Sequence, residues 1–296
     1  MDGLSTSAPS RRDIALPGRG DGAMASLDFG PTDRAYDLIF LHANGFNAQT
    51  YRRILAPLAE RSRILAVDQR GHGATTLPAV VEGRINWLDF RDDLLGLLEV
   101  LDARDVVLAG HSMGGTASLL ATAEAPSRVR RLALLDPVII PRAMGSGVSG
   151  SATANSPLIQ GALKRRATFP SREAALEAYK GRGAFATWPE DMLADYVAGG
   201  FVDAADGGVR LACEPAWEAS SFASHAHDPW DAFARTVCPI EILRAETGST
   251  CRVDDAIEAL TADGRITIET IPGATHFLPM ERPELATAVL ARALGR

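Results

Sequence analysis

The chain has 296 residues and a mass of 31.4 kDa, which suits one large domain with an insertion or two ordinary domains and excludes a mini-protein. Hydrophobic residues make up 46% and charged residues 23%, a composition that excludes a disordered or fibrous chain. The formal net charge is −7, which argues against nucleic acid as a partner because nucleic-acid binders need a basic surface.

The sequence contains no pattern of metal ligands and no membrane segment. Its three cysteines, Cys213, Cys238 and Cys251, form neither a CxxC pair nor an even disulfide set, and the histidines lack metal-ligand spacing. We therefore expect reduced thiols, no metal and no cofactor. No apolar run approaches the roughly 18–20 residues that span a bilayer, and the N-terminus lacks the apolar core of a secretory signal. A cytoplasmic protein without membrane contact, monomeric or homodimeric, is expected.

The predicted elements begin after a segment over residues 1–22 that is rich in Ser, Gly, Pro and Arg and is expected to be flexible. Residues 13–29 fit an antiparallel hairpin. From residue 33 onward, short aliphatic runs alternate with helical periods, which predicts a mostly parallel sheet flanked by helices, an α/β fold. The predicted strands cover residues 36–42, 63–68, 105–109, 131–136, 240–244 and 265–271, and the predicted helices cover 48–60, 87–101, 113–124 and 283–294.

The alternation stops after Asp136 and resumes near Pro239. This predicts a core made of residues 23–138 and 238–296, with a helical lid over residues 139–237 inserted after the sixth strand. Within the lid, the small residues at 149–156 suit a mobile connection, and helices are predicted at 171–180, capped by Ser171, and at 192–197.

A candidate nucleophile lies between the predicted strand at 105–109 and the predicted helix at 113–124. This stretch has the pattern G-x-S-x-G, which places a serine on a strained strand-to-helix turn with its hydroxyl exposed. The next backbone N–H then begins a helix, where unpaired donors and the helix dipole favour a developing negative charge. The pattern is formed by Gly110, His111, Ser112, Met113 and Gly114.

A serine hydroxyl needs a base within hydrogen-bond reach, and His276 is the candidate. It lies in a loop after the predicted strand at 265–271. The carboxyl ends of parallel strands meet at one edge of the sheet, so a sequence separation of 276 − 112 = 164 residues is no obstacle to contact with Ser112.

Together these segments resemble the α/β-hydrolase superfamily over residues 36–294. Four stretches carry the resemblance: LHANGF at 41–46 resembles the His-Gly loop, DQRGHG at 68–73 the turn after the second parallel strand, GHSMGG at 110–115 the nucleophile elbow, and PGATHF at 272–277 the histidine loop. The resemblance implies hydrolysis of an ester, amide, thioester or carbon–carbon bond by a serine nucleophile. It also implies an oxyanion hole formed by the backbone N–H groups of Asn44 and Met113.

The acid of the triad is where this sequence departs from the family pattern. Members usually carry an aspartate shortly after the strand that is predicted here at 240–244, but Gly248 stands at that place. Two candidates remain. Asp136 ends the strand at 131–136, a position that some branches of the family use, and Glu246 lies on the expected strand two residues early. We prefer Asp136 and keep Glu246 as the alternative.

The lid supplies the candidate substrate-binding residues. Aromatic side chains there can line an apolar pocket, and an arginine can hold a carboxylate. The candidates are Trp188, Trp217, Phe222 and Arg142.

The sequence therefore predicts a serine esterase, a carboxylic ester hydrolase that cleaves a small, partly hydrophobic ester through an acyl-enzyme. Cleavage of a carbon–carbon bond or an amide by the same fold is the alternative. The missing aspartate near Gly248 keeps a hypothesis of another class open, a non-catalytic protein that binds a small molecule as a receptor does.

Overall fold

A computed structural model describes residues 8–142 and 156–296. Within these ranges, eight strands form the central sheet: β1 Ser10–Ile14, β2 Met24–Phe29, β3 Leu38–Leu41, β4 Ile64–Val67, β5 Val106–His111, β6 Val129–Leu135, β10 Ile240–Thr247 and β11 Ile266–Thr275. The strand order is β1-β2-β4-β3-β5-β6-β10-β11. The six strands from β4 to β11 in this order are parallel to one another, which confirms the predicted α/β class.

The first two strands form the predicted hairpin. β1 pairs with β2 in antiparallel register, Ser10 opposite Asp28, and β2 pairs antiparallel with β4. The expectation of a flexible segment over residues 1–22 is therefore wrong for Ser10–Ile14. The ladder to β2 satisfies the backbone of this polar stretch, and the buried side chain of Ile14 anchors its end.

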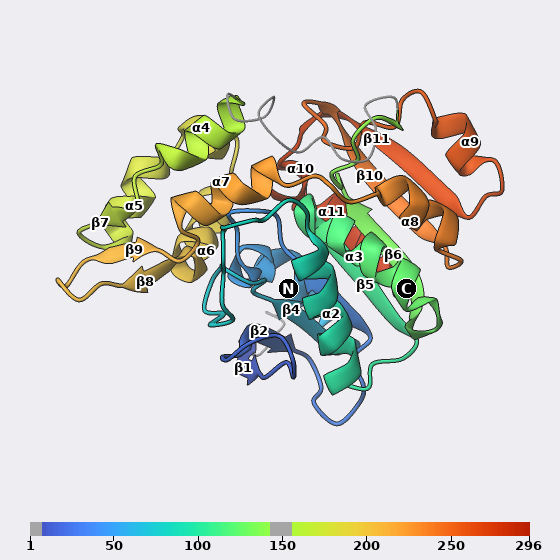
Figure 1. The fold of residues 1–296 in the computed structure, drawn as a ribbon, viewed down its shortest axis with the longest axis horizontal. Coiled ribbons are helices and arrows are strands. Elements are labelled where there is room, and N and C mark those ends of the chain that lie inside the picture. Colours follow the sequence, from blue (N-terminus) through green and yellow to red (C-terminus); the bar gives the residue numbers. More distant parts are fainter. Residues whose placement is uncertain (1–7, 143–155) are drawn as a thin grey trace, which may run out of the picture.

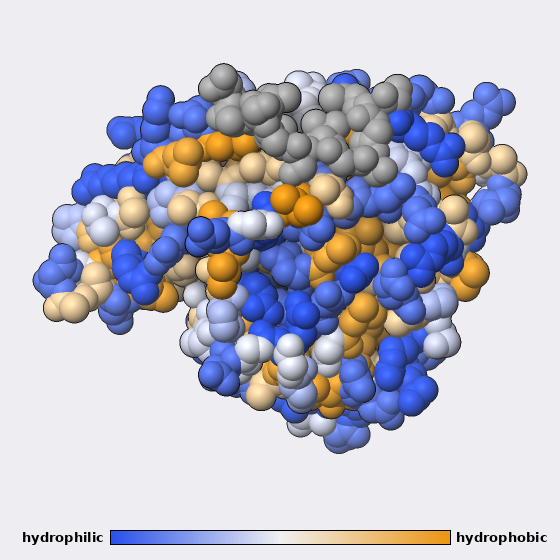
Figure 2. Space-filling view, viewed as in Figure 1, coloured by the Kyte–Doolittle hydropathy of each residue, from blue (hydrophilic) through white to orange (hydrophobic). Residues whose placement is uncertain are grey.

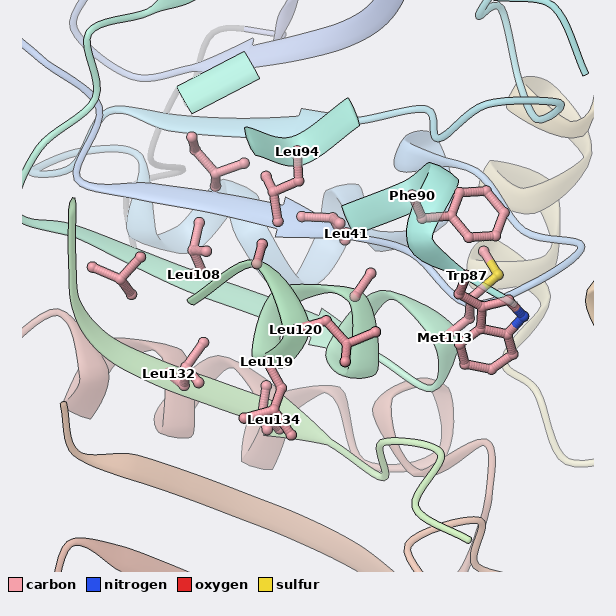
Figure 3. Packing of buried hydrophobic residues seen from close by; sticks show 14 of the residues in the cluster. Leu41, Trp87, Phe90, Leu94, Leu108, Met113, Leu119, Leu120, Leu132 and Leu134 are labelled. Carbon is pink, nitrogen blue, oxygen red and sulfur yellow. The ribbon is translucent and has the colours of Figure 1, made fainter. Parts of the chain in front are cut away.

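Helices cover both faces of the sheet (Figure 1). On one face, α2 Leu88–Val100, α3 Met113–Glu124 and α8 Pro229–Arg235 pack on the strands, and α9 Ile257–Thr261 contacts the same cluster. α1 Arg52–Leu55, α10 Leu278–Glu281 and α11 Pro283–Ala293 pack on the other face. Figure 3 shows Leu41 and Leu108 of the sheet packed near Leu94 of α2 and Leu120 of α3. The connection after α3 contains a 3₁₀ turn, η3 Pro126–Arg128.

The predicted helix at 48–60 is broken into three short turns, η1 Ala48–Tyr51, α1 and η2 Ala56–Leu58. Pro57 lies in the last of these turns and has no backbone N–H with which to continue an α-helical ladder. Asn47 caps η1 by accepting a hydrogen bond from the Thr50 backbone N–H.

The inserted segment between β6 and β10 extends as a lobe from one end of the sheet (Figure 1). It is mainly helical but also holds a small antiparallel sheet, in which β9 Val209–Leu211 lies between β7 Thr168–Phe169 and β8 Phe201–Asp203. The expectation of a purely helical lid is corrected by this sheet. Within the inserted segment, α6 Glu190–Gly200 packs on η1, whereas α8 packs on α3 of the core. The elements of the lobe are α4 Pro157–Leu163, β7 Thr168–Phe169, α5 Arg172–Tyr179, η5 Gly183–Phe185, α6 Glu190–Gly200, β8 Phe201–Asp203, β9 Val209–Leu211 and α7 Pro215–Ala223.

Ser171 caps α5 as predicted, because its hydroxyl accepts a hydrogen bond from the Ala174 backbone N–H. The predicted connection at 149–156 lies outside the described residues except for Ser156. The face shown in Figure 2 is mostly hydrophilic, with hydrophobic residues gathered over α4, where Leu158 and Leu163 are exposed. Among the described helices, none is long and apolar enough to cross a membrane.

Candidate active site

The turn between β5 and α3 forms a nucleophile elbow. Ser112 has φ 54° and ψ −121°, a strained conformation for a residue with a side chain. The turn closes because its neighbours lack side chains. A Cβ at Gly114 would lie 2.3 Å from the Leu41 carbonyl oxygen, and a Cβ at Gly110 would lie 2.4 Å from the Gly114 carbonyl carbon. The glycines of the motif therefore allow the backbone approach that holds Ser112 at the sheet edge.

The structure brings Ser112, His276 and Asp136 into one hydrogen-bonded line. His276 Nε2 lies 3.0 Å from the Ser112 hydroxyl oxygen, and His276 Nδ1 lies 2.6 Å from Asp136 Oδ2. The Asp136 side chain is fully buried, whereas that of His276 is 21% exposed. With Nδ1–H donating to the carboxylate, Nε2 is free to accept the serine proton, which is the arrangement that serine nucleophiles require.

Asp136 is held as an ionised carboxylate by several donors. Its Oδ1 accepts from the Ala245 N–H at 2.9 Å and from the Ser249 hydroxyl at 2.5 Å, and its Oδ2 accepts from the Thr250 N–H at 2.9 Å. Burial raises the pKa of this carboxyl, but the hydrogen bond and electrostatic interaction with His276, together with the Ser249 and Ala245 donors, outweigh burial. The pKa of Asp136 is therefore lowered.

Glu246, the alternative acid, lies elsewhere. It is exposed near the end of β10, and its carboxylate accepts a hydrogen bond from the Gly273 backbone N–H at 2.9 Å. The hydrogen-bond partners of the His276 ring in this structure are Ser112, Asp136 and Thr250. Of the two candidates, Asp136 is the carboxylate that the fold places against His276.

A buried chain of hydrogen bonds joins the three loops of the site. The Ala43 N–H donates to the Tyr51 hydroxyl, and this hydroxyl lies 2.8 Å from His111 Nδ1. On the other side of the same ring, His111 Nε2 lies 2.8 Å from the His276 carbonyl oxygen. Burial lowers the pKa of His111 to about 3, so its ring is neutral. A neutral ring donates a hydrogen bond through one nitrogen and accepts one through the other. His111 thus braces the histidine loop against the elbow.

One predicted oxyanion donor, Asn44, lines the same cavity as the nucleophile, and the other, Met113, follows the nucleophile in the chain. Met113 begins α3, so its backbone N–H has no intrahelical acceptor. Two buried imidazoles support the loop at 41–46. His42 Nε2 accepts from the Gln69 N–H at 2.9 Å, and His72 Nε2 accepts from the Gly45 N–H at 3.0 Å.

A cavity of about 550 Å³ opens at Ser112 and His276. Its walls are mostly apolar and come from the loop at 41–46, from α4, from α7 and from the segment around Thr250. Of the four lid residues predicted to bind substrate, Phe222 lines this cavity.

The other three predicted residues are not among the described residues that line the cavity, and each has other partners. Trp188 packs on Phe46 and Phe277, and Trp217 donates from its indole to the Arg70 carbonyl oxygen. The guanidinium of Arg142 lies 5.4 Å from the centre of the Trp230 ring. Large aromatic side chains fill lid and core alike, so composition did not separate these roles.

Sequence reasoning missed three groups at the site: the Ser249 and Thr250 donors, the Tyr51 hydroxyl, and an Arg165–Glu218 ion pair that lines the cavity. A signal existed for the first group. Small polar residues follow Gly248 at the place where the family usually carries its acid, which suggests donors to a carboxylate that has moved. No local pattern marks Tyr51 or Glu218.

Replacing Ser249 with alanine removes the 2.5 Å hydrogen bond to Asp136 without removing the carboxylate. A bond to a charged acceptor is worth about 1.5–3 kcal/mol. We expect Ser249→Ala to lower kcat about tenfold with KM nearly unchanged and to raise the pKa of Asp136. Steady-state kinetics on an ester measures both parameters. A fall in kcat that Ser249→Thr does not restore would contradict a role for this hydroxyl.

Comparison with known proteins agrees with this geometry. A model of the alpha/beta hydrolase family matches residues 38–289. The chain is 28% identical over 252 residues to 2-(acetamidomethylene)succinate hydrolase of Mesorhizobium japonicum, covering 84% of each protein. It is also 31% identical over 104 residues to 2-hydroxymuconate semialdehyde hydrolase of a Pseudomonas species, about a third of each chain (34% and 36%).

Among solved structures, that of E-2-(acetamidomethylene)succinate hydrolase superposes with a TM-score of 0.79 at 23% identity and covers 97% of this chain and 100% of its own. At this level of identity the superposition shows a common fold. The family match spans the elbow, the histidine loop and the whole parallel sheet. The chain therefore belongs to the alpha/beta hydrolase family.

Proposed function

We propose that the chain is a serine hydrolase that cleaves a small, partly hydrophobic ester through an acyl-enzyme on Ser112. The observation that carries the proposal is the line from Ser112 through His276 to Asp136, at 3.0 and 2.6 Å, at the wall of a cavity of about 550 Å³. A receptor that only binds its ligand has no need of a strained serine, a histidine and a buried carboxylate in this order.

In the proposed mechanism the Ser112 oxygen attacks the ester carbonyl carbon while its proton passes to His276 Nε2. The backbone N–H groups of Met113 and Asn44 donate to the tetrahedral oxyanion. The ester C–O bond then breaks as His276 returns the proton to the leaving oxygen. A water molecule, deprotonated by His276, attacks the acyl carbon and releases a carboxylic acid and the free serine. Asp136 fixes the histidine tautomer and stabilises the imidazolium.

Amide cleavage is the second candidate. The relative from Mesorhizobium is named for a substrate with an acetamido group, and the similarity to it extends over most of both chains. The same nucleophile, base and oxyanion donors serve an amide, whose nitrogen takes the proton from His276.

We also propose that the inserted segment, residues 139–237, acts as a lid that selects the substrate, because α4 and α7 supply much of the cavity wall.

A fluorophosphonate probe tests the nucleophile directly. We expect stoichiometric labelling, with the modified peptide containing Ser112, and a burst of p-nitrophenol from a p-nitrophenyl ester, because acyl-enzymes accumulate when deacylation is slow. Protein that is unfolded in acid before the probe is added must not be labelled. This control separates an activated serine from nonspecific reaction of the probe with surface residues. A folded protein that is neither labelled nor active on esters, thioesters and amides would instead support the receptor hypothesis.

A further inference from the structure

A charged cluster lies in the wall of the otherwise apolar cavity. Arg165 follows α4, and its side chain is 16% exposed. One of its terminal nitrogens donates to Glu218 Oε2 at 2.9 Å, and the other donates to the Tyr196 hydroxyl. All three residues line the cavity that opens at Ser112. A guanidinium seated this deeply is costly to desolvate and calls for partners inside the site.

The cluster lies directly against the proposed oxyanion loop. A Cβ placed on Gly45 would meet Glu218 Oε1 at 2.5 Å and an Arg165 terminal nitrogen at 3.5 Å. The Asn44 side-chain amide donates to the Glu218 carbonyl oxygen at 3.0 Å, and the Tyr196 hydroxyl donates to the Gly45 carbonyl oxygen at 3.2 Å. The guanidinium is therefore one residue along the loop from the N–H group that would hold the oxyanion.

Arg165 still has donor capacity. A guanidinium carries five N–H groups, and the bonds to Glu218 and Tyr196 use two of them. Both of these bonds come from its terminal nitrogens, so among the described residues they leave the Nε–H and two terminal N–H groups of Arg165 unassigned. Because Arg165 lines the cavity, a bound molecule can accept from these donors.

The charge balance of the cavity wall favours an anion. Among its described lining residues, Arg165 and Arg252 are opposed by one carboxylate, Glu218. The remaining walls are largely apolar, so a charge placed there interacts through a low local dielectric. Arginine presents a planar fork that matches a carboxylate.

We propose that this site takes acyl compounds that carry a carboxylate a few bonds from the scissile carbonyl, such as a half-ester or half-amide of a short dicarboxylic acid, and that Arg165 binds this carboxylate. The inference rests on the proposed function and gives its substrate class. Arg252 adds a second positive charge to the same cavity. The apolar wall of α4 is left for the leaving group.

The test compares two nearly isosteric substrates, monoethyl succinate, which is anionic, and ethyl succinamate, which is neutral. Proton release in a pH-stat gives kcat/KM for each, and their ratio is the measured quantity. We expect wild type to prefer the anion and Arg165→Met to lower the ratio about 100-fold. Arg165→Met with Glu218→Gln is measured as well, because the single variant leaves Glu218 without its partner. Arg166→Met, at an exposed neighbour outside the cavity, is the matched control.

An unchanged ratio in both Arg165 variants, with both substrates still hydrolysed, would overturn the anchor and leave the serine hydrolase standing. If wild type hydrolyses neither ester and takes no fluorophosphonate label, the proposed function fails, and calorimetry with monoethyl succinate then decides the anchor. Binding that Arg165→Met abolishes and Arg166→Met keeps would support it, and absence of binding would overturn it.

Discussion

Ser112→Ala is expected to reduce kcat by about 10⁵-fold or more, because it removes the only atom proposed to form the acyl-enzyme. The hydroxyl accepts no hydrogen bond that the fold depends on, and its one side-chain contact of this kind is with His276 Nε2 at 3.0 Å. We therefore expect the melting temperature to change by only a few degrees. Turnover of an ester by purified variant and wild type, measured with a thermal unfolding curve for each, gives the comparison.

The matched control for this variant is Ser118→Ala. Ser118 lies in α3, the helix that follows Ser112, and it is buried. It donates to the Gly114 carbonyl oxygen at 2.8 Å without lining the cavity. We expect it to keep ester turnover within about twofold while losing about 1 kcal/mol of stability. Retention of a tenth or more of wild-type activity in Ser112→Ala would rule out a serine acyl-enzyme.

Asp136→Asn is expected to lower kcat by about 10⁴-fold, as in serine enzymes whose acid is replaced by its amide, because the amide no longer holds the imidazole in the productive tautomer. The substitution keeps the side-chain volume at a fully buried site. It also places an uncharged group where the Ala245, Ser249 and Thr250 donors converge, so we expect a measurable loss of stability as well.

Glu246→Gln is the control for the acid assignment. The glutamine can still accept from the Gly273 N–H, and position 246 is exposed, so we expect kcat and the melting temperature to stay near the wild-type values. The opposite pattern, with Glu246→Gln inactive and Asp136→Asn active, would transfer the role of the acid to Glu246.

Elements with a strong local signal were predicted correctly. The helix predicted at 113–124 is α3 Met113–Glu124, and each strand predicted in the parallel sheet is present with ends shifted by a few residues. Periodicity and the strand-to-helix motif are local properties, so a single segment is enough to reveal them. Pro57 is visible in the sequence as a helix breaker, whereas the strand at Ser10–Ile14 depended on backbone hydrogen bonds to β2 that composition does not display.

The inserted segment between β6 and β10 shows the limit of composition as a guide to function. Trp188, Trp217 and Phe222 were equivalent as aromatic candidates, yet one lines the cavity and two pack the protein. Conversely, Arg165 belongs to a run of three basic residues that would suit a solvated surface, but its side chain is mostly buried beside Glu218. α4 and α7 pack against each other, and Arg165, which follows α4, thereby meets Glu218 of α7.

The sequence by itself determined the fold class and singled out Ser112 and His276 as candidates, because a tight glycine-flanked turn and a loop after a strand are encoded over a few adjacent residues. The sequence also favoured Asp136 as the acid but left Glu246 open, and the tertiary structure places Asp136 against the histidine. β10 lies beside β11 and β6 lies one strand further away, so strand order alone favours Glu246 over Asp136. Neighbouring strands lie roughly 4.8 Å apart, whereas the hydrogen bond between His276 and Asp136 is 2.6 Å long and requires its atoms to be placed far more precisely. Only the three-dimensional paths of the chain after β6 and β10 give that precision.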